Sequence, residues 1–137
     1  MTKVTVDAPI ADVKTEVSVE EKKITVAASK PKTVKETVEE YFKDTPIMAN
    51  VAWCESRNRQ FEPNGEIFRG KVNSDDIGVM QINTYYHLKA AKARGNDLFT
   101  LQGNLDYAKY LFEREGTTPW MSSSKCWIPR SNLVATK

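Results

Sequence analysis

The aromatic side chains of this chain are confined to the part after residue 40, which also holds both cysteines and every glycine. Residues 1–32 instead repeat Val, Thr, Lys, Glu and Ala, and so have little with which to build a core. We therefore expect a flexible N-terminal tail or linker, which could tether the chain to a larger assembly. The alternative is an edge strand, indicated by two short period-2 valine pairs, Val4/Val6 and Val17/Val19.

The charges are nearly balanced, with 20 Lys and Arg against 18 Asp and Glu and a formal net charge of +2. Nucleic-acid binding depends on clustered Lys and Arg contacts to phosphate, so we expect no nucleic-acid partner. From Thr45 onward the chain has 12 basic and 9 acidic residues, or +3, which mildly favours a polyanionic matrix as the partner.

Membrane spans, metals and cofactors are also not expected. The chain is 28% charged and has no unbroken apolar run of about 18 residues. Lys3 is followed by Asp7 and Asp12 rather than by the apolar stretch of a secretory signal. One histidine and two cysteines cannot supply a multi-histidine or four-cysteine metal site. We expect a cofactor-free monomer.

Two helices are predicted at the start of the folded part. Thr33 and Glu36 match a capping box that opens a helix over 34–44. Thr45-Pro46 then provides a cap and a favoured first-turn proline for a second, mostly buried helix that ends near Arg57.

A hairpin and two further helices are predicted after them. Turn-forming residues between 61 and 76 indicate a small, irregular β-hairpin, with 79–82 in a strand. Helices are expected over 84–94 and 101–115, stopped by Gly95 and Gly116 respectively.

These elements predict an α+β, mainly helical fold. The folded domain is expected to cover 33–130. No regular structure is expected after Gly116, and residues 131–137 are expected to fray.

Glu55 is the unusual residue of the second helix, because its neighbours at i−3, i−4 and i−7 are Ala52, Val51 and Met48. A carboxyl group on or beside an apolar face has a raised pKa. If it stays protonated near neutral pH, it can donate its proton to the leaving oxygen of a glycosidic bond. The alternative is that Glu55 pairs with a nearby arginine. The helix dipole opposes a glutamate near a helix C-terminus, so a compensating reason is expected.

Three short motifs follow one another along the chain: Glu55-Ser56-Arg57, then Gly78-Val79-Met80-Gln81-Ile82-Asn83, then Asn104-Leu105 with Tyr110-Leu111. In order and spacing they resemble the lysozyme-like lytic transglycosylases that cut bacterial peptidoglycan. In that superfamily the Glu-Ser pair ends a buried helix, and the Gly-x-Met-Gln-Ile-Asn strand follows a variable hairpin. The resemblance covers about 45–127 and implies a lysozyme-like fold.

By this resemblance Glu55 is the general acid, and then the base that acts on whatever attacks the anomeric carbon. Gln81 and Asn83 would line the sugar cleft. The period of a strand also places them on one side, with Met80 and Ile82 on the other. Hydrogen bonds that pin the hairpin to the helix are the alternative role of Gln81 and Asn83.

Two serines and the last predicted helix provide further candidate contacts to the substrate. Ser56 and Ser74 could orient the carboxylate or the N-acetyl group of the substrate. The resemblance favours Asn104 and Tyr107, one turn apart on the last predicted helix, as cleft residues, although core packing is expected of at least one of Tyr107 and Tyr110. His87 is expected at the surface or the core edge rather than in catalysis.

The chain departs from the commonest transglycosylase pattern in two places. Residues 116–127 replace an Ala-Tyr-Asn-Ala-Gly segment, so no late catalytic tyrosine is assigned. Asp76, two residues before Gly78, resembles the strand of animal-type lysozymes and of transglycosylases attached to secretion systems. It is a candidate second carboxylate, and its alternative role is to cap the bend that it closes.

The two cysteines bear on location. A bridge between Cys54 and Cys126 would tie the C-terminal loop to the helix of Glu55, closing a loop of about 70 residues and contributing roughly 4 kcal/mol in the chain-entropy model. That would suit an oxidising, extracytoplasmic setting such as the periplasm, the cell wall or delivery by a virion. Two unpaired buried thiols are the alternative.

The sequence therefore predicts a peptidoglycan-cleaving lytic transglycosylase that acts on glycan strands with Glu55 as general acid and base. A lysozyme-type hydrolase that uses Glu55 and Asp76 is the second prediction. A non-catalytic module that binds the cell wall or assists its assembly is the rival from another class.

Overall fold

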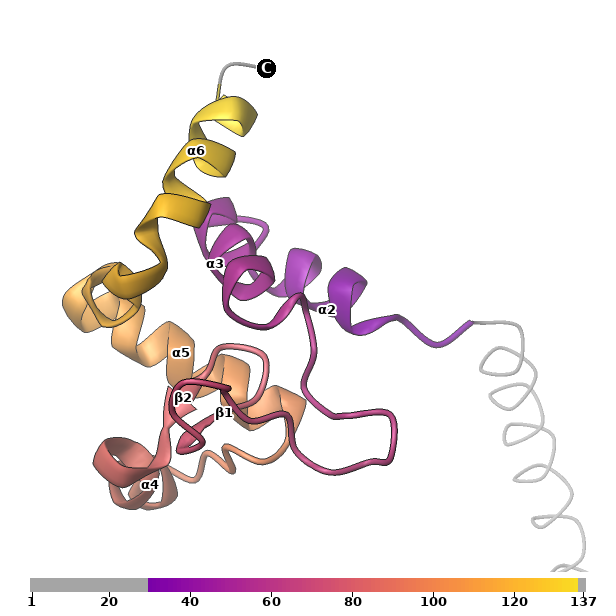
Figure 1. Ribbon diagram of the computed structural model, residues 1–137, viewed down its shortest axis with the longest axis vertical. Coiled ribbons are helices and arrows are strands. Elements are labelled where there is room, and N and C mark those ends of the chain that lie inside the picture. The colour runs from indigo at the N-terminus through magenta and orange to yellow at the C-terminus, as the bar shows by residue number, and fades with distance from the viewer. Residues whose placement is uncertain (1–29, 136–137) are drawn as a thin grey trace, which may run out of the picture. The chain divides into compact units, whose positions relative to one another are not determined.

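The computed structural model describes residues 30–135, and Figure 1 shows them as a mainly helical arrangement with one small antiparallel hairpin. The predicted α+β class is confirmed. The predicted tail over 1–32 lies outside the described residues except for its last three, which are irregular. Within the described range, no helix is both long enough and apolar enough to cross a membrane.

Helices α2 (Val34–Tyr41) and α3 (Pro46–Ser56) begin where the local signals predict. Thr33 and Glu36 form both halves of the capping box, since the backbone N–H of each donates to the side-chain oxygen of the other. Helix α2 ends at Tyr41 rather than at 44, because the chain leaves the helical conformation at Phe42. Pro46 opens α3 as predicted, but the Thr45 side chain makes no capping hydrogen bond to it.

The hairpin pairs β1 (Asp76–Ile77) with β2 (Ile82–Asn83) in antiparallel register, Asp76 opposite Asn83. The expected strand over 79–82 is wrong, because residues 78–81 form the turn between the two strands. Gly78 and Gln81 open and close this turn with φ of +77° and +52°.

Gly78 is required at the start of the turn. Besides its positive φ, a Cβ there would collide with the side-chain amides of Asn104 and Gln60. The predicted sidedness survives in the turn, since Met80 and Ile82 are buried whereas Gln81 and Asn83 are half-buried. The hairpin therefore holds the amide side chains of Gln81 and Asn83 on the side away from the core.

Helices α4 (Thr84–Ala93) and α5 (Leu101–Glu115) match their predicted ranges to within one residue. Asn83 caps α4 by accepting the N–H of Tyr86 at 3.1 Å, and Thr100 caps α5 by accepting the N–H of Gly103 at 3.0 Å. Gly116 follows α5 at a φ of +64°, in the role that was predicted for it.

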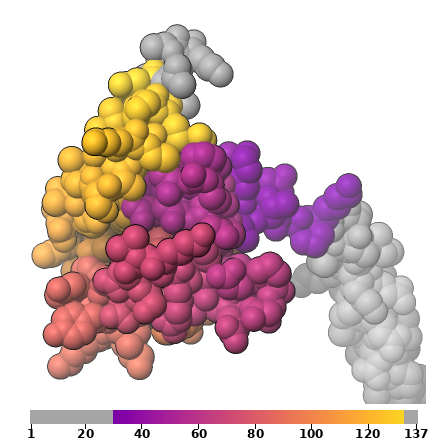
Figure 2. Space-filling view, in the orientation of Figure 1, coloured from indigo at the N-terminus to yellow at the C-terminus, as the bar shows by residue number. Residues whose placement is uncertain are grey.

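The expectation of irregular chain after Gly116 is wrong. A 3₁₀ helix, η1 (Thr118–Ser123), leads directly into α6 (Ser124–Ala135), which includes most of the segment that was expected to fray. Local sequence opposes α6, because it opens in a serine run and contains Pro129 in its interior. Packing against α3 stabilises it instead, and the two lie side by side on the face drawn in Figure 2.

One core joins the elements. Its buried side chains come from α3, the hairpin, α5 and the C-terminal segment, and include Met48, Val51, Ile77, Met80, Leu105, Leu111, Trp120 and Trp127. Two fully buried amides, Gln60 and Asn104, serve the backbone of the hairpin turn. Gln60 accepts the N–H of Val79 at 2.8 Å and Asn104 accepts the N–H of Met80 at 2.9 Å, so the turn is hydrogen-bonded from inside the protein.

Candidate functional site

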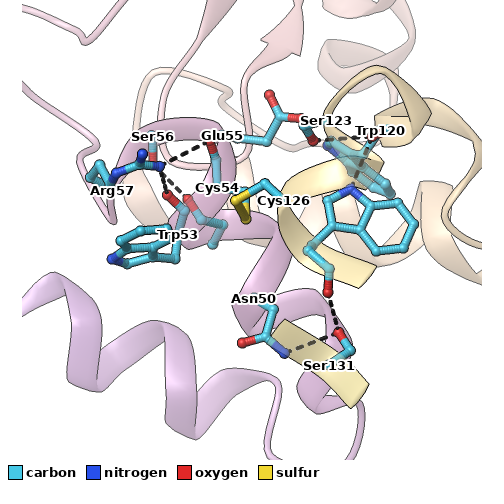
Figure 3. Close-up of a disulfide and its surroundings, with 12 residues drawn as sticks. Asn50, Trp53, Cys54, Glu55, Ser56, Arg57, Trp120, Ser123, Cys126 and Ser131 are labelled. Carbon is cyan, nitrogen blue, oxygen red and sulfur yellow. Dashed lines mark hydrogen bonds between the residues drawn. A yellow bond between two sulfur atoms is a disulfide. The ribbon is translucent and has the colours of Figure 1, made fainter. Parts of the chain in front are cut away.

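Glu55 lies in the last turn of α3 and is half-buried. The Ser123 hydroxyl, at the end of η1, donates to Glu55 Oε2 at 2.6 Å, and the same hydroxyl lies 3.1 Å from the Trp120 carbonyl. Figure 3 shows the Glu55 side chain pointing toward Ser123 across the gap between α3 and the C-terminal segment. The carboxyl group therefore has one fixed hydrogen-bond partner.

The pKa of Glu55 is raised above its ordinary value, as the sequence predicted. Burial is the largest cause, because it disfavours the charged carboxylate. The hydrogen bond from Ser123 acts in the opposite direction, and the negative charge of Asp76 raises the pKa further. Ser123, from the C-terminal segment, and Asp76, from the hairpin, thus shift the pKa of Glu55 in opposite directions.

A disulfide joins Cys54 of α3 to Cys126 of α6. The Cα atoms are 5.9 Å apart and the sequence separation is 72 residues, so the predicted bridge is confirmed and the alternative of two free thiols is wrong. Cys54 precedes Glu55 directly, and Cys126 follows Ser123 by one helical turn. The bridge therefore holds Ser123 beside the carboxyl group (Figure 3).

Two tryptophans attach the C-terminal segment to the rest of the site. The Trp120 indole donates to the Met80 carbonyl of the hairpin turn at 2.9 Å, and the Trp127 indole donates to the Trp120 carbonyl at 3.1 Å. Both rings are buried, so these hydrogen bonds are shielded from water. The Trp120 hydrogen bond connects η1 to the turn that carries Gln81, and the Trp127 hydrogen bond connects α6 to η1.

Asp76 lies in β1 and is half-buried, whereas Asp75 before it is exposed. The Asn83 amide donates to Asp76 Oδ1 at 2.9 Å across the hairpin. The bend belongs to Asn73, whose side chain accepts the N–H of Asp75 at 2.9 Å, so the alternative role of Asp76 as a turn cap is wrong. Asp76 is part of the wall that faces Glu55.

Two adjoining hollows form the cleft, and both are lined by Glu55, Asp76, Gln81 and Ser122. The smaller, of about 110 Å³, is completed by Asn83, His87, Pro119 and Trp120, among others. The larger, of about 600 Å³, extends over Arg57, Arg59, Phe68 and Lys71. A hollow of this size is within the range of sites that bind small molecules.

Gln81 and Asn83 lie in the cleft as predicted, but their amides also serve the hairpin. The Gln81 amide donates to the carbonyls of Asp76 and Gly78 at 3.2 and 3.1 Å. Asn83 donates to Asp76 and caps α4. These hydrogen bonds lie within the hairpin and at the start of α4, and none of them joins Gln81 or Asn83 to the helix of Glu55, which was the structural alternative. Contact with a substrate stays a prediction.

Other predicted contacts lie away from the cleft. Asn104 is 0% exposed and donates to the carbonyls of Ile77 and Leu98, so its amide is fully used inside the protein. Tyr107 is 2% exposed and packs in the core. Ser74 is exposed outside both hollows. Their placement as cleft residues is not supported, because the spacing that suggested it is equally that of a core helix or a loop.

Ser56 adjoins the larger hollow, but its hydroxyl is turned inward. It is 1% exposed, donates toward the carbonyls of Ala52 and Val79, and accepts the N–H of Arg59. It therefore joins the end of α3 to the hairpin turn and makes no hydrogen bond to the Glu55 carboxylate.

His87, Ser122 and Ser123 were not predicted in the site. His87 lies at the core edge as expected, yet it also lines the smaller hollow, and its Nδ1 is 3.0 Å from the Tyr107 hydroxyl. Burial lowers the pKa of His87. The serines carry no local signal in the sequence, because they reach the site only through α6 and the disulfide.

Within residues 30–135 no group of three or more His, Cys, Asp and Glu side chains is arranged to hold a metal ion. Comparison of the chain with protein-family models, with curated proteins and with solved structures finds no match. Function is therefore inferred from the geometry of the site and from the motifs that surround Glu55.

Proposed function

We propose that this chain is a peptidoglycan lytic transglycosylase, which cleaves the β-1,4 bond between N-acetylmuramic acid and N-acetylglucosamine. The environment of Glu55 carries the proposal. A half-buried carboxyl group with a raised pKa, in a cleft wide enough for sugars, is what proton donation to a glycosidic oxygen requires.

The proposed reaction uses Glu55 twice. As an acid it protonates the leaving oxygen while the bond to the anomeric carbon breaks. As a carboxylate it then takes the proton of the muramic acid 6-hydroxyl, whose oxygen forms the new bond to the anomeric carbon. The product is a 1,6-anhydromuropeptide, and no water is consumed.

Ser123 suits both states of Glu55. Its hydroxyl has one hydrogen and two acceptors within reach, Glu55 Oε2 and the Trp120 carbonyl. It can donate to Oε2 of the Glu55 carboxylate, and also to Oε2 of the protonated acid when the proton is on Oε1, which leaves that proton for the glycosidic oxygen. Glu55 therefore keeps one orientation through the proton transfers.

The test is the clearing of purified cell walls by the wild type and by Glu55→Gln. We expect the variant to lose turbidity clearance and the release of soluble muropeptides by at least about a hundred-fold, the size of a general-acid contribution. Glu62→Gln, which removes a carboxylate outside the cleft, is the matched control. Wall binding by both forms without muropeptide release by the wild type would instead identify a binding module.

A lysozyme-type hydrolase is the second candidate, because Asp76 lines the same hollows and its charge acts on Glu55. A retaining hydrolase needs a second carboxylate about 5 to 5.5 Å from the acid, whereas the transglycosylase does not. We expect Asp76→Asn to keep a substantial part of the activity and the products to be anhydromuropeptides, lighter by one water. Reducing-end products alone, abolished by Asp76→Asn, would decide for the hydrolase.

We further propose that the protein acts outside the cytoplasm, in the periplasm, in the cell wall or carried there by a virion. The disulfide beside Glu55 supports this, because such bonds persist in oxidising surroundings. A free-thiol assay on protein taken directly from its native compartment tests it, and we expect no reactive thiols.

A further inference from the structure

The chain leaves α3 through two consecutive left-handed residues, neither of them glycine. Arg57 has a φ of +57° and Asn58 a φ of +61°. A side chain with a Cβ is disfavoured in this conformation, and such positions gather at functional sites. Here the turn begins two residues after Glu55, and both Arg57 and Arg59 line the larger hollow.

Both guanidinium groups are held in place. Arg57 lies over the Trp53 ring (Figure 3), 3.8 Å from its centre, and its Nη1 donates to the Trp53 carbonyl at 3.0 Å. Arg59 lies 4.1 Å from the centre of the Phe68 ring, and its Nε donates to the Ser56 carbonyl at 2.8 Å. Each arginine still has N–H donors that these contacts do not use.

Neither arginine has a carboxylate partner in the part of the chain that the structure describes, where the ion pairs are Lys35–Glu39 and Lys43–Glu40. Lys71, exposed on the loop before β1, lines the same hollow. Three cations thus line the larger hollow and are absent from the smaller one, whereas Glu55 and Asp76 line both. A neutral sugar polymer gives these cations no counter-charge.

We propose that Arg57 and Arg59, assisted by Lys71, form a subsite for a carboxylate carried by the substrate. A held guanidinium presents its donors in the planar geometry that a carboxylate accepts, and needs little reordering to bind it. The inference depends on the proposed function, in which the glycan bears peptide substituents that end in carboxylates. It makes the substrate class a peptide-bearing strand rather than an uncharged amino-sugar polymer.

The experiment measures binding rather than cleavage, so that the two proposals can fail separately. Protein with Glu55→Gln is titrated with two preparations of glycan strands free of phosphate polymers. One bears its peptides, and the other is stripped of them and has its freed lactyl carboxylates converted to amides, so that it carries no carboxylate. We expect the peptide-bearing strands to bind about ten-fold or more tightly, which is the lower range for a hydrogen bond to a charged group. Raising the salt to about 1 M should remove most of that difference.

Arginine variants are added one at a time in the same background. Arg59→Gln and Arg57→Gln should each weaken binding of the peptide-bearing strands by about ten-fold. Neither variant should change the affinity for the stripped strands. Because Arg57 also donates to carbonyls at the end of α3, each variant is checked by its melting temperature. Lys71→Gln, which removes no hydrogen bond within the described residues, should weaken the same binding to a smaller degree.

Arg94→Gln is the matched control, since Arg94 is an exposed arginine 3.7 Å from the centre of the Tyr110 ring and lines neither hollow of the cleft. Equal affinity for the two strand preparations, or an equal loss in Arg94→Gln, would overturn the subsite. Tighter binding to stripped strands that carry a phosphate polymer than to peptide-bearing ones would overturn the assignment to a peptide carboxylate. Selective binding by a protein that never cleaves would support the subsite and reject only the enzyme.

Discussion

The two walls of the cleft are built in different ways. The hairpin wall, with Asp76, Gln81 and Asn83, is attached to the core by hydrogen bonds from the buried amides Gln60 and Asn104. The C-terminal wall, formed by η1 and α6, is attached by a disulfide and by the indoles of two tryptophans.

The two walls are therefore sensitive to different changes. Hydrogen bonds from buried amides fail when a side chain is removed and are insensitive to redox conditions. A disulfide can be opened without any change of sequence. We therefore expect the C-terminal wall to respond to reductant while the hairpin wall remains in place.

The largest effect is expected at Asn104. Asn104→Ala removes the side chain that accepts the Met80 N–H and donates to the Ile77 and Leu98 carbonyls, so three buried hydrogen bonds are lost and the Met80 N–H loses its partner. We expect the free energy of unfolding to fall by about 3 to 4 kcal/mol. Chemical denaturation measures it, with the exposed Asn73→Ala as control at no more than about 1 kcal/mol. A loss as small as that of the control would mean that the turn is held by other contacts.

Replacing both cysteines should have the next largest effect. The pair Cys54→Ser and Cys126→Ser should lower the free energy of unfolding by about 2 to 4 kcal/mol. Hydrogen exchange should show loss of amide protection in η1 and α6 and little change in residues 77–82. Reductant should reproduce this in the wild type and leave the double variant unaffected. Joint loss of protection in both walls would show that they are one cooperative unit.

The two walls should also shift the pKa of Glu55 in opposite directions. Ser123 lowers it and Asp76 raises it, so Ser123→Ala should raise the pKa of Glu55 and Asp76→Asn should lower it. NMR titration of the Glu55 carboxyl carbon measures both shifts, with Ser122→Ala as control. Shifts of the same sign in the two variants would contradict the opposition.

The raised pKa of Glu55 also determines how this group changes the stability of the folded protein with pH. Because the folded protein holds the Glu55 proton to higher pH than the unfolded chain does, this group lowers stability as pH rises from the unfolded pKa through the folded pKa. Ser123→Ala should extend that loss to higher pH. Denaturation at several pH values between acid and neutral checks it, and Glu55→Gln should remove this component of the pH dependence.

The smallest effect is expected from deleting residues 1–29. The capping box at Thr33 and Glu36 and the whole described core lie after the deletion, so the melting temperature should not change by more than about 1 °C. A longer deletion that also removes Thr33 and Glu36 should cost about 1 kcal/mol through the lost cap. A large drop with the shorter deletion would show that these residues belong to the fold.

Elements with local signals were predicted well. These signals act on neighbours within four residues, so their effect can be predicted without the rest of the fold. They are the Thr33 capping box, Pro46 at the start of α3 and Gly116 after α5. The α6 helix and the turn at 78–81 were missed. Pro129 and the serine run oppose a helix locally, and an apolar run such as Val79–Ile82 is equally consistent with a strand or a buried turn.

The sequence by itself determined that a carboxyl group would stand at the end of a buried helix with an amide-bearing hairpin downstream, because helix spacing and turn residues act over a few positions. Tertiary structure decided which polar groups meet that carboxyl group. Ser123 arrives from 68 residues away, through a disulfide and a helix that the local sequence disfavours. Asn104 is taken out of the cleft for the same reason, since a buried turn needs hydrogen-bond partners that only the packed protein can supply.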